Sequence, residues 1–452
     1  MTLKLNSNIV LKYNKDEILN QCIKENTFEN PIYVSNEENG RSNWNTERFI
    51  TTYRHEDDSI VLPRGYMRDL LKILKEHDIT PEIIDERVCS HCHYPEKLNE
   101  VTLRSYQTRA VDEAMKFDQG AIISPTGSGK SLIGLEIIRR RGQKAIIIVH
   151  RSELAKQWIR VIEERLGIKA GFIGDGEWVI GDQITVAMVQ TLASSENGVK
   201  LVSDSVGMVL VDEGHHLPSD QFFSITNLLA AKYRYMMSAT VERRDGLETM
   251  IYRAIGPSIA NISREEVEEL GATVPATVIQ IQTGFNPGLV NSWSEYLDTL
   301  TTSTERNIRI TELARQSDGY CLILVDRVAH TEQLSEMLTR RNIDHVVAHG
   351  KISKKEREGV MERIKTAKLT IGTTSLLGEG LDVSAWDTLI MGAPISSEIK
   401  LLQAVGRIVR PSKGKEKAVV YDLKDECGFS GASFNKRFAI YKKNKILVQF
   451  QK

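Results

Sequence analysis

The chain has 452 residues, of which 41% are hydrophobic and 26% charged, and its formal net charge is −1. This length predicts roughly three domains of about 150 residues each, and the composition excludes a fibrous or largely disordered chain. The near-zero net charge excludes a globally basic protein, so any contact with nucleic acid must be local.

Cysteine content and hydropathy indicate the compartment. The five cysteines are few and odd in number, and Cys321 lies in an apolar run, which favours a reducing cytosol over a disulfide framework. No apolar run approaches the ~18 residues needed to cross a bilayer, and the first residues lack the pattern of a signal peptide. We therefore expect a soluble cytoplasmic protein without a membrane partner.

Residues 1–100 are polar and patchy, and we predict that they form a small α+β accessory domain that binds DNA. Apolar residues at i, i+3, i+4 and i+7 predict a helix within Tyr66–His77. The opposite face of this helix carries Arg68, Lys72 and Lys75. A solvated face is the ordinary interpretation of such charges, and contact with DNA is the alternative.

The segment Cys89-Ser-His-Cys92-His93 resembles half of a zinc site. Neither a second C-x-x-C nor an H-x-x-x-H pair follows nearby, so the other half is missing. A pair of reduced thiols in a loop is the preferred interpretation, and zinc at Cys89 and Cys92 is the alternative.

From residue 101 onward, short apolar runs alternate with amphipathic segments. Runs this apolar are typical of parallel strands covered on both faces by helices. The pattern predicts two α/β domains, 101–262 and 306–452, joined by a linker at 263–305. The predicted strands are Ala121–Ile123, Ala145–Val149, Ile184–Ala187, Met208–Val211 and Tyr235–Met237, then Tyr320–Val325, His345–Ala348, Leu369–Gly372, Thr388–Met391 and Ala418–Tyr421.

The segment Ser124-Pro-Thr-Gly-Ser-Gly-Lys-Ser131 lies between a predicted strand and a predicted helix, which is the context of a phosphate-binding loop. Its glycines allow backbone N–H groups to face the phosphates, with the positive end of the helix dipole behind them. Lys130 is predicted to reach the β and γ phosphates, and Ser131 to bind Mg²⁺. The first position is Ser124 where the general pattern has glycine. The predicted phosphate-binding residues are Thr126, Gly127, Ser128, Gly129, Lys130 and Ser131.

The run Met208–Val211 ends in the adjacent acids Asp212 and Glu213. Acids that follow a buried parallel strand lie at the edge of the sheet where ligands bind. Asp212 is predicted to hold Mg²⁺, and Glu213 to polarise the water that attacks the γ-phosphate. We therefore expect ATP and Mg²⁺ as cofactors.

Asp212-Glu-Gly-His215 after a Gly-Ser-Gly-Lys-Ser loop resembles the DExH branch of the superfamily-two helicases. This resemblance implies two tandem RecA-like domains that hydrolyse ATP. Other family motifs follow in order along the first domain. Leu103-Arg-Ser-Tyr-Gln107 resembles the adenine-recognising segment, which implies that Arg104 and Gln107 contact the nucleotide.

Two further segments, Val149–Trp158 and Val189–Leu192, resemble motifs that contact a DNA strand, which implies DNA contacts from Arg151, Gln190 and Thr191. The elements that couple hydrolysis to movement in this family are resembled by His215 and by Ser238, Ala239 and Thr240.

The second domain carries the remaining motifs of the same family. The resemblance implies DNA contacts from Lys351, Thr373 and Thr374, nucleotide contacts from Gly380 and Asp382, and catalytic roles for Gln403, Arg407 and Arg410. Arg407 and Arg410 stand about one helical turn apart, so both guanidinium groups could point the same way. On domain closure they would reach the γ-phosphate as arginine fingers.

Within the family, Ser238–Asp245 and Ile255-Gly-Pro257 are most similar to XPB-like and phage UvsW-like helicases. Arg243-Arg-Asp245 stands where XPB-like enzymes have Arg-Glu-Asp, and its middle residue has the opposite charge. The compact size is closer to the phage group, which would place the protein in the host cytoplasm. That group remodels branched or forked DNA, by fork regression and by branch migration of Holliday junctions or D-loops, in replication, recombination or repair.

Alternatives remain. An RNA helicase is one, because the motifs contact the sugar-phosphate backbone, which RNA and DNA share. An ATP-gated clamp or motor subunit on duplex DNA, without strand separation, is another.

Near the C-terminus, basic residues alternate with Phe434, Phe438 and Tyr441. These aromatic residues could stack on bases, or they could anchor the last segment to the second domain.

Overall fold

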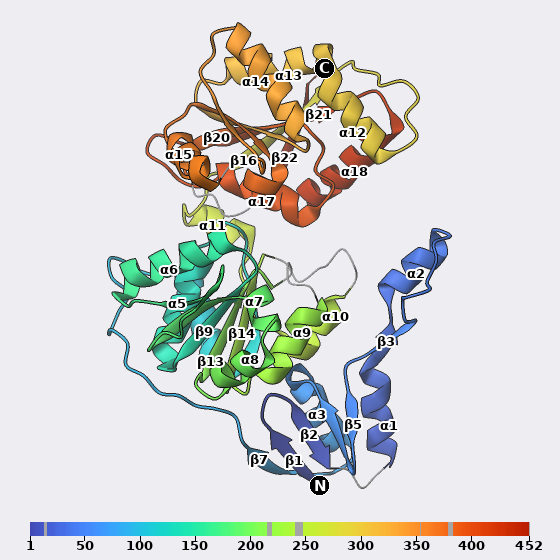
Figure 1. Ribbon diagram of the computed structural model, residues 1–452, viewed down its shortest axis with the longest axis vertical. Helices are drawn as coiled ribbons and strands as arrows, with labels where there is room; N and C mark the ends of the chain where they lie inside the picture. Colours follow the sequence, from blue (N-terminus) through green and yellow to red (C-terminus); the bar gives the residue numbers. More distant parts are fainter. Residues whose placement is uncertain (13–15, 215–218, 240–246, 353, 378–382, 452) are drawn as a thin grey trace. The chain divides into compact units, whose positions relative to one another are not determined.

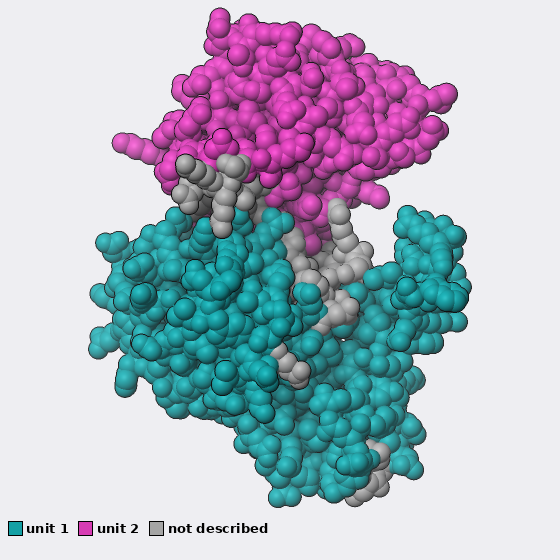
Figure 2. Space-filling model, in the orientation of Figure 1, with its two compact units in different colours: residues 1–125, 129–263 teal, residues 126–128, 264–452 magenta. Residues whose placement is uncertain are grey.

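The computed structural model describes residues 1–12, 16–214, 219–239, 247–352, 354–377 and 383–451. The chain divides into two compact units, residues 1–125 with 129–263 and residues 126–128 with 264–452 (Figure 2). None of the helices within the described ranges is long and apolar enough to cross a membrane.

The first unit begins with a small α+β lobe, here called the N-terminal lobe, formed by residues 1–85 (Figure 1). Its sheet has the order β5-β6-β2-β1-β7, in which β7 runs parallel to β1 and the other pairs are antiparallel. The predicted helix is present as α3 (Met67–Glu76), and its apolar face joins the core of the lobe. The other elements are β1 (Thr2–Leu5), β2 (Ile9–Lys12), α1 (Asp16–Glu25), β5 (Arg54–Glu56), β6 (Ser59–Leu62), η1 (Arg64–Tyr66) and β7 (Glu82–Asp85).

An arm projects from this lobe, as Figure 1 shows. It consists of β3 (Thr27–Glu29) and β4 (Phe49–Thr51), which pair in antiparallel fashion, with α2 (Pro31–Glu38) and a loop between them. Helix α2 contains no buried residue. Packing against a core therefore does not fix the arm, and polar side chains must order it.

The remainder of the first unit is an α/β domain. Its sheet has the order β11-β10-β12-β9-β13-β14-β8-β15, and only the β10–β11 pair is antiparallel among the described strands. The strands are β8 (Gln119–Ile123), β9 (Ala145–Val149), β10 (Gly171–Gly174), β11 (Glu177–Trp178), β12 (Ile184–Met188), β13 (Met208–Asp212), β14 (Tyr233–Ser238) and β15 (Ser258–Asn261). The helices are α4 (Ser105–Lys116), α5 (Lys130–Arg141), α6 (Ser152–Leu166), α7 (Val189–Ala193), α8 (Glu196–Ser203), α9 (Ser219–Leu228) and α10 (Glu248–Ile255).

The central strands of this sheet are buried on both faces. Side chains of α7 to α10 pack with Ile146 and Val209 on one face. On the other face Gly134 of α5 lies against Leu210, Met237 and Trp158, so closely that an added Cβ would come within 2.8 Å of the first two. This double cover explains why the strands are nearly continuous apolar runs.

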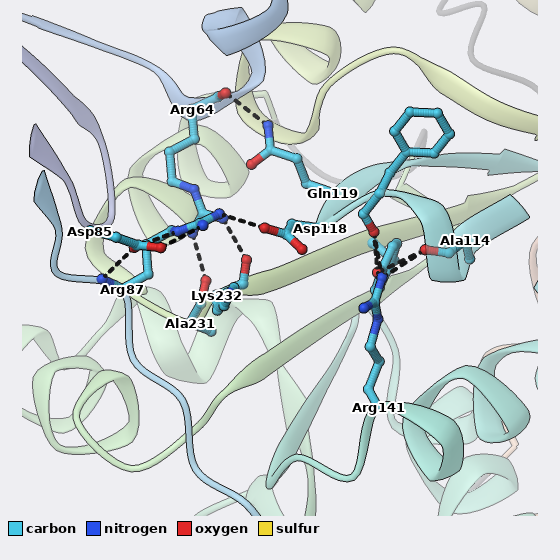
Figure 3. A network of polar contacts seen from close by, with 11 residues as sticks. Arg64, Asp85, Arg87, Ala114, Asp118, Gln119, Arg141, Ala231 and Lys232 are labelled. Atoms are coloured by element: carbon cyan, nitrogen blue, oxygen red, sulfur yellow. Dashed lines mark hydrogen bonds and ion pairs between the residues drawn. The ribbon is translucent and has the colours of Figure 1, made fainter. Parts of the chain in front are cut away.

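Buried Arg64 and half-buried Arg87 attach the N-terminal lobe and the segment that follows it to the α/β domain (Figure 3). Arg64 is only 2% exposed, and its guanidinium donates to the carbonyl oxygens of Ala231 and Lys232 at 2.5 and 2.7 Å. Arg87 forms an ion pair with Asp118 at 3.1 Å. Burial, followed by the nearby charges of Arg234 and Arg87, lowers the pKa of Arg64 well below the usual range. Such a guanidinium is costly to bury unless its donors are satisfied, so this contact requires an accurate fit.

The second unit is also an α/β domain. Its sheet is parallel throughout the described strands, with the order β18-β19-β17-β20-β21-β16-β22. The strands are β16 (Ala276–Gln282), β17 (Tyr320–Val325), β18 (Val346–Ala348), β19 (Leu369–Thr373), β20 (Trp386–Met391), β21 (Ala418–Lys424) and β22 (Leu447–Gln451). The helices are α11 (Arg264–Glu269), α12 (Trp293–Thr302), α13 (Thr304–Gln316), α14 (Val328–Arg340), α15 (Lys354–Ile364), α16 (Thr374–Leu377), α17 (Glu398–Ile408) and α18 (Gly428–Lys443).

The segment 263–305, predicted as a linker, contains regular structure. It includes β16, which lies between β21 and β22 in the sheet, and also α11 and α12. Of the three C-terminal aromatic residues, two anchor the last segment to the second domain and one remains accessible for stacking on a base. Tyr441 is fully buried and Phe434 nearly so, whereas Phe438 is 36% exposed.

A buried histidine makes the stability of the second domain depend on pH. His330 is 1% exposed, its Nε2 lies 2.8 Å from Asn307 Oδ1, and burial lowers its pKa from 6.5 to about 3. The unfolded chain therefore binds a proton below pH 6.5 that the folded domain does not, and the free energy of unfolding falls as the pH falls from 6.5 towards 3.

Between pH 8 and pH 5 we expect the free energy of unfolding, measured with urea, to fall by roughly 2 kcal/mol because of His330. His330→Gln should abolish this part of the pH dependence, whereas His93→Gln, at an exposed position, should leave it. Identical pH profiles for His330→Gln and the unmodified protein would contradict this account.

Candidate nucleotide site and nucleic-acid-contacting segments

The phosphate-binding loop connects β8 to α5 as predicted. Gly127 and Gly129 have φ values of +90° and +79°, which side chains other than glycine adopt only with strain. Lys130 is the first residue of α5, so it stands at the positive end of the helix dipole. The backbone N–H of Ser124, the first residue of the loop, donates to Ser238 O at 2.9 Å. This bond joins the loop directly to the strand that carries the predicted coupling motif.

Gln107, predicted to recognise adenine, lies beside the loop. It is 1% exposed, and its Oε1 accepts from the backbone N–H of Arg104 at 2.9 Å at the start of α4. A Cβ added to Gly129 would come within 2.5 Å of Gln107 Nε2. The structure thus brings the segment of Arg104 and Gln107 next to the loop, although Gln107 precedes Gly129 by 22 residues in the sequence.

The predicted acids stand at the carboxyl end of β13. The Nζ of Lys130 lies 2.9 Å from Glu213 Oε1, and both side chains are largely shielded from solvent. Glu213 has a φ of +50°, an uncommon conformation for this residue type. Backbone strain of this kind is found at functional sites, where the surrounding structure enforces it.

Asp212 is buried, with a relative exposure of 6%. Its Oδ2 accepts from Trp158 Nε1 of α6 at 2.8 Å, and no described residue donates to its buried Oδ1. Burial, followed by the nearby charge of Glu213, raises the pKa of Asp212 from 3.8 to about 6, while Lys130 opposes this shift. A buried carboxylate oxygen of this kind suits a hard divalent cation, for which oxygen atoms are the preferred ligands. The orphaned oxygen of Asp212 therefore fits the Mg²⁺ ligand predicted at this position, and the Ser131 hydroxyl stays a predicted ligand.

The role of Trp158 was not anticipated from the sequence. Its indole fixes the orientation of the Asp212 carboxylate and is itself 2% exposed. The only sequence signal is a tryptophan on the apolar face of an otherwise polar helix, which ordinarily indicates core packing alone.

Two predicted DNA-contacting segments of the first domain lie next to each other. Arg151 follows β9 and Gln190 follows β12, and these strands pair in parallel with Val149 opposite Met188. Gln190 Nε2 donates to His150 O at 3.1 Å, which ties the two segments together. Thr191 lies on the same short helix as Gln190, so the three predicted contacts share one edge of the sheet.

The second domain shows the same arrangement. Lys351 follows β18, and Thr373 and Thr374 stand at the end of β19, with which β18 pairs in parallel. Thr373 is 2% exposed, and its Oγ1 lies 3.2 Å from Ser375 Oγ.

The predicted catalytic residues of the second domain belong to one segment. Gln403 and Arg407 are 6% and 7% exposed in α17. That helix ends at Ile408, and Arg410 lies beyond it, so the expected spacing of one helical turn between Arg407 and Arg410 does not hold. Helix geometry therefore does not align the two guanidinium groups.

Some predicted residues lie outside the described ranges. These are His215, Thr240, Arg243–Asp245, Gly380 and Asp382. Ser238 is the last residue of β14, and Ala239 follows it.

The Cys89–His93 segment makes contacts of a different kind from those of a zinc site. Gln143 Nε2 lies 2.8 Å from His91 Nδ1, and the backbone N–H groups of Ser90 and Cys92 donate to Gln143 Oε1 and Gly142 O. Within the described ranges no group of three potential metal ligands occurs. The contacts that are present connect the segment after the N-terminal lobe to the residues between α5 and β9 of the first α/β domain.

Two families match the chain. Residues 100–243 match the family described as "Type III restriction enzyme, res subunit", and residues 305–412 match the "Helicase conserved C-terminal domain". Together the two matches span more than half of the chain.

Individual similar proteins align with a larger part of the chain than the two family matches do. The protein named "Probable helicase D10" of Escherichia phage T5 is 25% identical over 383 residues, which cover 83% of this chain and 82% of that protein. "DNA 3'-5' translocase XPB2" of Sulfurisphaera tokodaii is 24% identical over 397 residues, covering 78% of this chain and 88% of that protein.

A solved structure supports the fold. Saccharomyces cerevisiae Dbp5, solved bound to RNA and ADP BeF3, is 16% identical and aligns with a TM-score of 0.56, covering 77% of this chain and 89% of that chain. Phage T4 UvsW covers 100% of this chain and 99% of its own at 18% identity, with a TM-score of 0.45, a level that does not by itself establish a common fold.

These matches confirm the two tandem RecA-like domains of the predicted fold class, and the structure shows the small N-terminal α+β domain in front of them. They also explain why a phosphate loop, an Asp-Glu pair and the later motifs occur in this order along one chain. The chain belongs to the superfamily-two helicases, of the type that includes XPB and phage helicases, and is an ATP-hydrolysing enzyme.

Proposed function

We propose that this enzyme is an ATP-driven DNA translocase that remodels branched or forked DNA. The observation that carries the proposal is the conjunction of Lys130, Asp212 and Glu213 at one sheet edge with nucleic-acid motifs along both α/β domains. Support for DNA comes from the similarity to a protein named as a DNA translocase and to a phage helicase. Support for branched DNA comes from the resemblance to UvsW-like enzymes.

In this proposal ATP binds at the phosphate loop, from Thr126 to Ser131, with Gln107 and Arg104 contacting the base. Mg²⁺, which the family generally uses, would be held by Ser131 and Asp212 and would neutralise charge on the phosphates. Gly380 and Asp382 are proposed as further nucleotide contacts.

The Lys130–Glu213 ion pair suggests how nucleotide binding would activate the site. The phosphates would compete with Glu213 for the ammonium group of Lys130, because the phosphates and the Glu213 carboxylate are both anionic. Glu213 would then be released to orient and polarise the attacking water. Gln403, Arg407 and Arg410 are proposed to stabilise charge that develops during hydrolysis.

Movement on DNA would use the two groups of predicted contacts. Arg151, Gln190 and Thr191 in the first domain, and Lys351, Thr373 and Thr374 in the second, are proposed to hold the sugar-phosphate backbone. His215 and Ser238–Thr240 are proposed to couple hydrolysis to stepping. The bond from Ser124 N–H to Ser238 O supplies one physical link for this coupling.

The test uses the full chain with ATP, Mg²⁺ and DNA substrates of equal length. We expect a four-way junction or a fork to be dissociated at least several-fold faster than a linear duplex. Equal rates would contradict the preference for branched DNA. ATP hydrolysis stimulated by RNA and not by the matched DNA would favour an RNA helicase, and stimulation without any strand displacement would favour a clamp.

A further inference from the structure

Arg410, one of the proposed catalytic residues, lies beyond the end of its helix. Helix α17 ends at Ile408, and the next residue, Val409, accepts at its carbonyl oxygen from the N–H of Val274 at 2.8 Å. Pro411 follows Arg410 and disfavours a helical conformation of the residue before it. Contacts outside the helix must therefore set the position of Arg410.

The ammonium group of Lys415 supplies such a contact. Its Nζ donates to the carbonyl oxygen of Arg410 at 2.7 Å, to that of Ser384 at 3.0 Å, and also to that of Trp386. An ammonium group has three N–H donors and no acceptor, so three carbonyl oxygens satisfy it completely. Trp386 is fully buried and is the first residue of β20, an interior strand of the sheet. Lys415 therefore ties the backbone of Arg410 to the core of the second domain.

A tight turn brings Lys415 back to Arg410. Gly414 has a φ of +80°, a conformation that other residues adopt only with strain. The backbone N–H of Lys415 donates to Ser412 O at 3.1 Å and closes the turn. The short segment after α17 is thus shaped so that its own lysine holds the carbonyl group of its arginine.

The surroundings of Lys415 make its charge sensitive to pH. Burial lowers the pKa of its ammonium group from 10.5 to about 8; the carboxylate of Asp387 opposes this shift, and the guanidinium of Arg410 adds to it. The charged neighbours on the turn itself are all exposed: Lys413, Glu416 and Lys417. A neutral amine has two N–H donors for the three carbonyl oxygens, and its lone pair is repelled by the third. The tie to Arg410 should therefore weaken as the pH rises through about 8.

We propose that Lys415 is a positioning residue for ATP hydrolysis, which holds the backbone of Arg410 so that its guanidinium group meets the charge that develops on the phosphates. This inference rests on the proposed catalytic role of Arg410. Lys415 itself would contact neither the nucleotide nor DNA, and it would act on turnover only through Arg410.

A double-mutant cycle on the full-length protein tests this role. With saturating DNA and ATP, Arg410→Ala should lower kcat about 10²-fold and Lys415→Met about tenfold, while Lys415→Met changes the KM for ATP by less than about threefold. In the Arg410→Ala background, Lys415→Met should lower kcat by less than about twofold, because the residue that it positions is already absent. Lys413→Met, which removes an exposed lysine of the same turn, should behave as the unmodified protein does.

The pH profile of kcat separates positioning from general support of the fold. Between about pH 7 and pH 9.5 the kcat of the unmodified protein should fall several-fold as Lys415 loses its proton. Lys415→Arg keeps a charged donor group at all these pH values, so it should retain most of the turnover at neutral pH and lose this alkaline fall. Urea unfolding of each variant measures the stability of the second domain alongside.

An unchanged kcat for Lys415→Met, or a tenfold loss that persists in the Arg410→Ala background, would overturn the assignment, since Lys415 would then not act through Arg410. If Lys415→Met does not fold, an alkaline fall of Lys415→Arg equal to that of the unmodified protein would overturn it. An Arg410→Ala protein with normal turnover would instead refute the proposed role of Arg410, on which the inference rests.

Discussion

Replacing Lys130 by alanine is expected to abolish ATP hydrolysis, with a fall in kcat of at least about 10³-fold. The ammonium group stands at the start of α5 and contacts Glu213 at 2.9 Å. Its loss would remove the charge proposed to meet the β and γ phosphates. It would also raise the pKa of Asp212 further, because Lys130 now opposes that shift. Steady-state hydrolysis with saturating DNA measures the loss of turnover, and binding of a fluorescent ATP analogue measures any loss of nucleotide affinity.

The matched control is Lys169→Ala, which removes an exposed lysine of the same domain. This variant should hydrolyse ATP at the rate of the unmodified protein. If Lys130→Ala retained more than about a tenth of the activity, the loop would not be the hydrolytic site.

Glu213→Gln is expected to separate binding from turnover. Glutamine preserves the shape of the side chain, but it cannot accept a proton from water and does not form an ion pair with Lys130. Hydrolysis should fall about 10³-fold, within the range found for loss of a general base, while ATP binding is retained. The variant should also lower the pKa of Asp212, since the charge of Glu213 is the second cause of its elevation.

Single-turnover hydrolysis and nucleotide binding, measured on the same preparation, test this separation. Glu163→Gln, at an exposed position on α6, serves as the control and should behave as the unmodified protein does. Should Glu213→Gln lose ATP affinity and turnover together, Glu213 would be a binding residue and the water-polarising role would have to be assigned elsewhere.

The central strands could be predicted closely from the sequence because both faces of each are buried. Ala145–Val149 and Tyr320–Val325 were predicted with the observed bounds, and each is an uninterrupted apolar run. Strands near the sheet edges lack this signal. The two-residue β11 is exposed, β22 is mostly exposed at the edge, and β15 is interrupted by a change of register. β16 alternates buried and half-buried residues in a segment otherwise typical of a linker.

The candidate site was predictable where chemistry depends on residues close in sequence. The loop from Ser124 to Ser131 and the Asp212–Glu213 pair are local patterns with known geometry. Contacts that depend on the fold could not be predicted. These include the bond from Trp158 to Asp212 and the positive φ of Glu213, which follow from the packing of α6 against β13 and from the turn after that strand.

The N-terminal lobe illustrates the same limit. Composition separated residues 1–100 from the rest, and helical periodicity located α3. The sequence gives no sign that Arg64 is buried against carbonyl oxygens 167 and 168 residues away, or that the polar segment around Trp44 is ordered. Both depend on side-chain-to-backbone hydrogen bonds, which leave no hydrophobic pattern in a sequence.

The most direct test of the whole account is the rate of ATP hydrolysis by the full-length protein, measured with no nucleic acid, with DNA and with matched RNA. A translocase on DNA should hydrolyse ATP at least about tenfold faster with DNA than without it, and faster with DNA than with RNA. The same rate under all three conditions would contradict the account, because hydrolysis would then not be coupled to a nucleic-acid track.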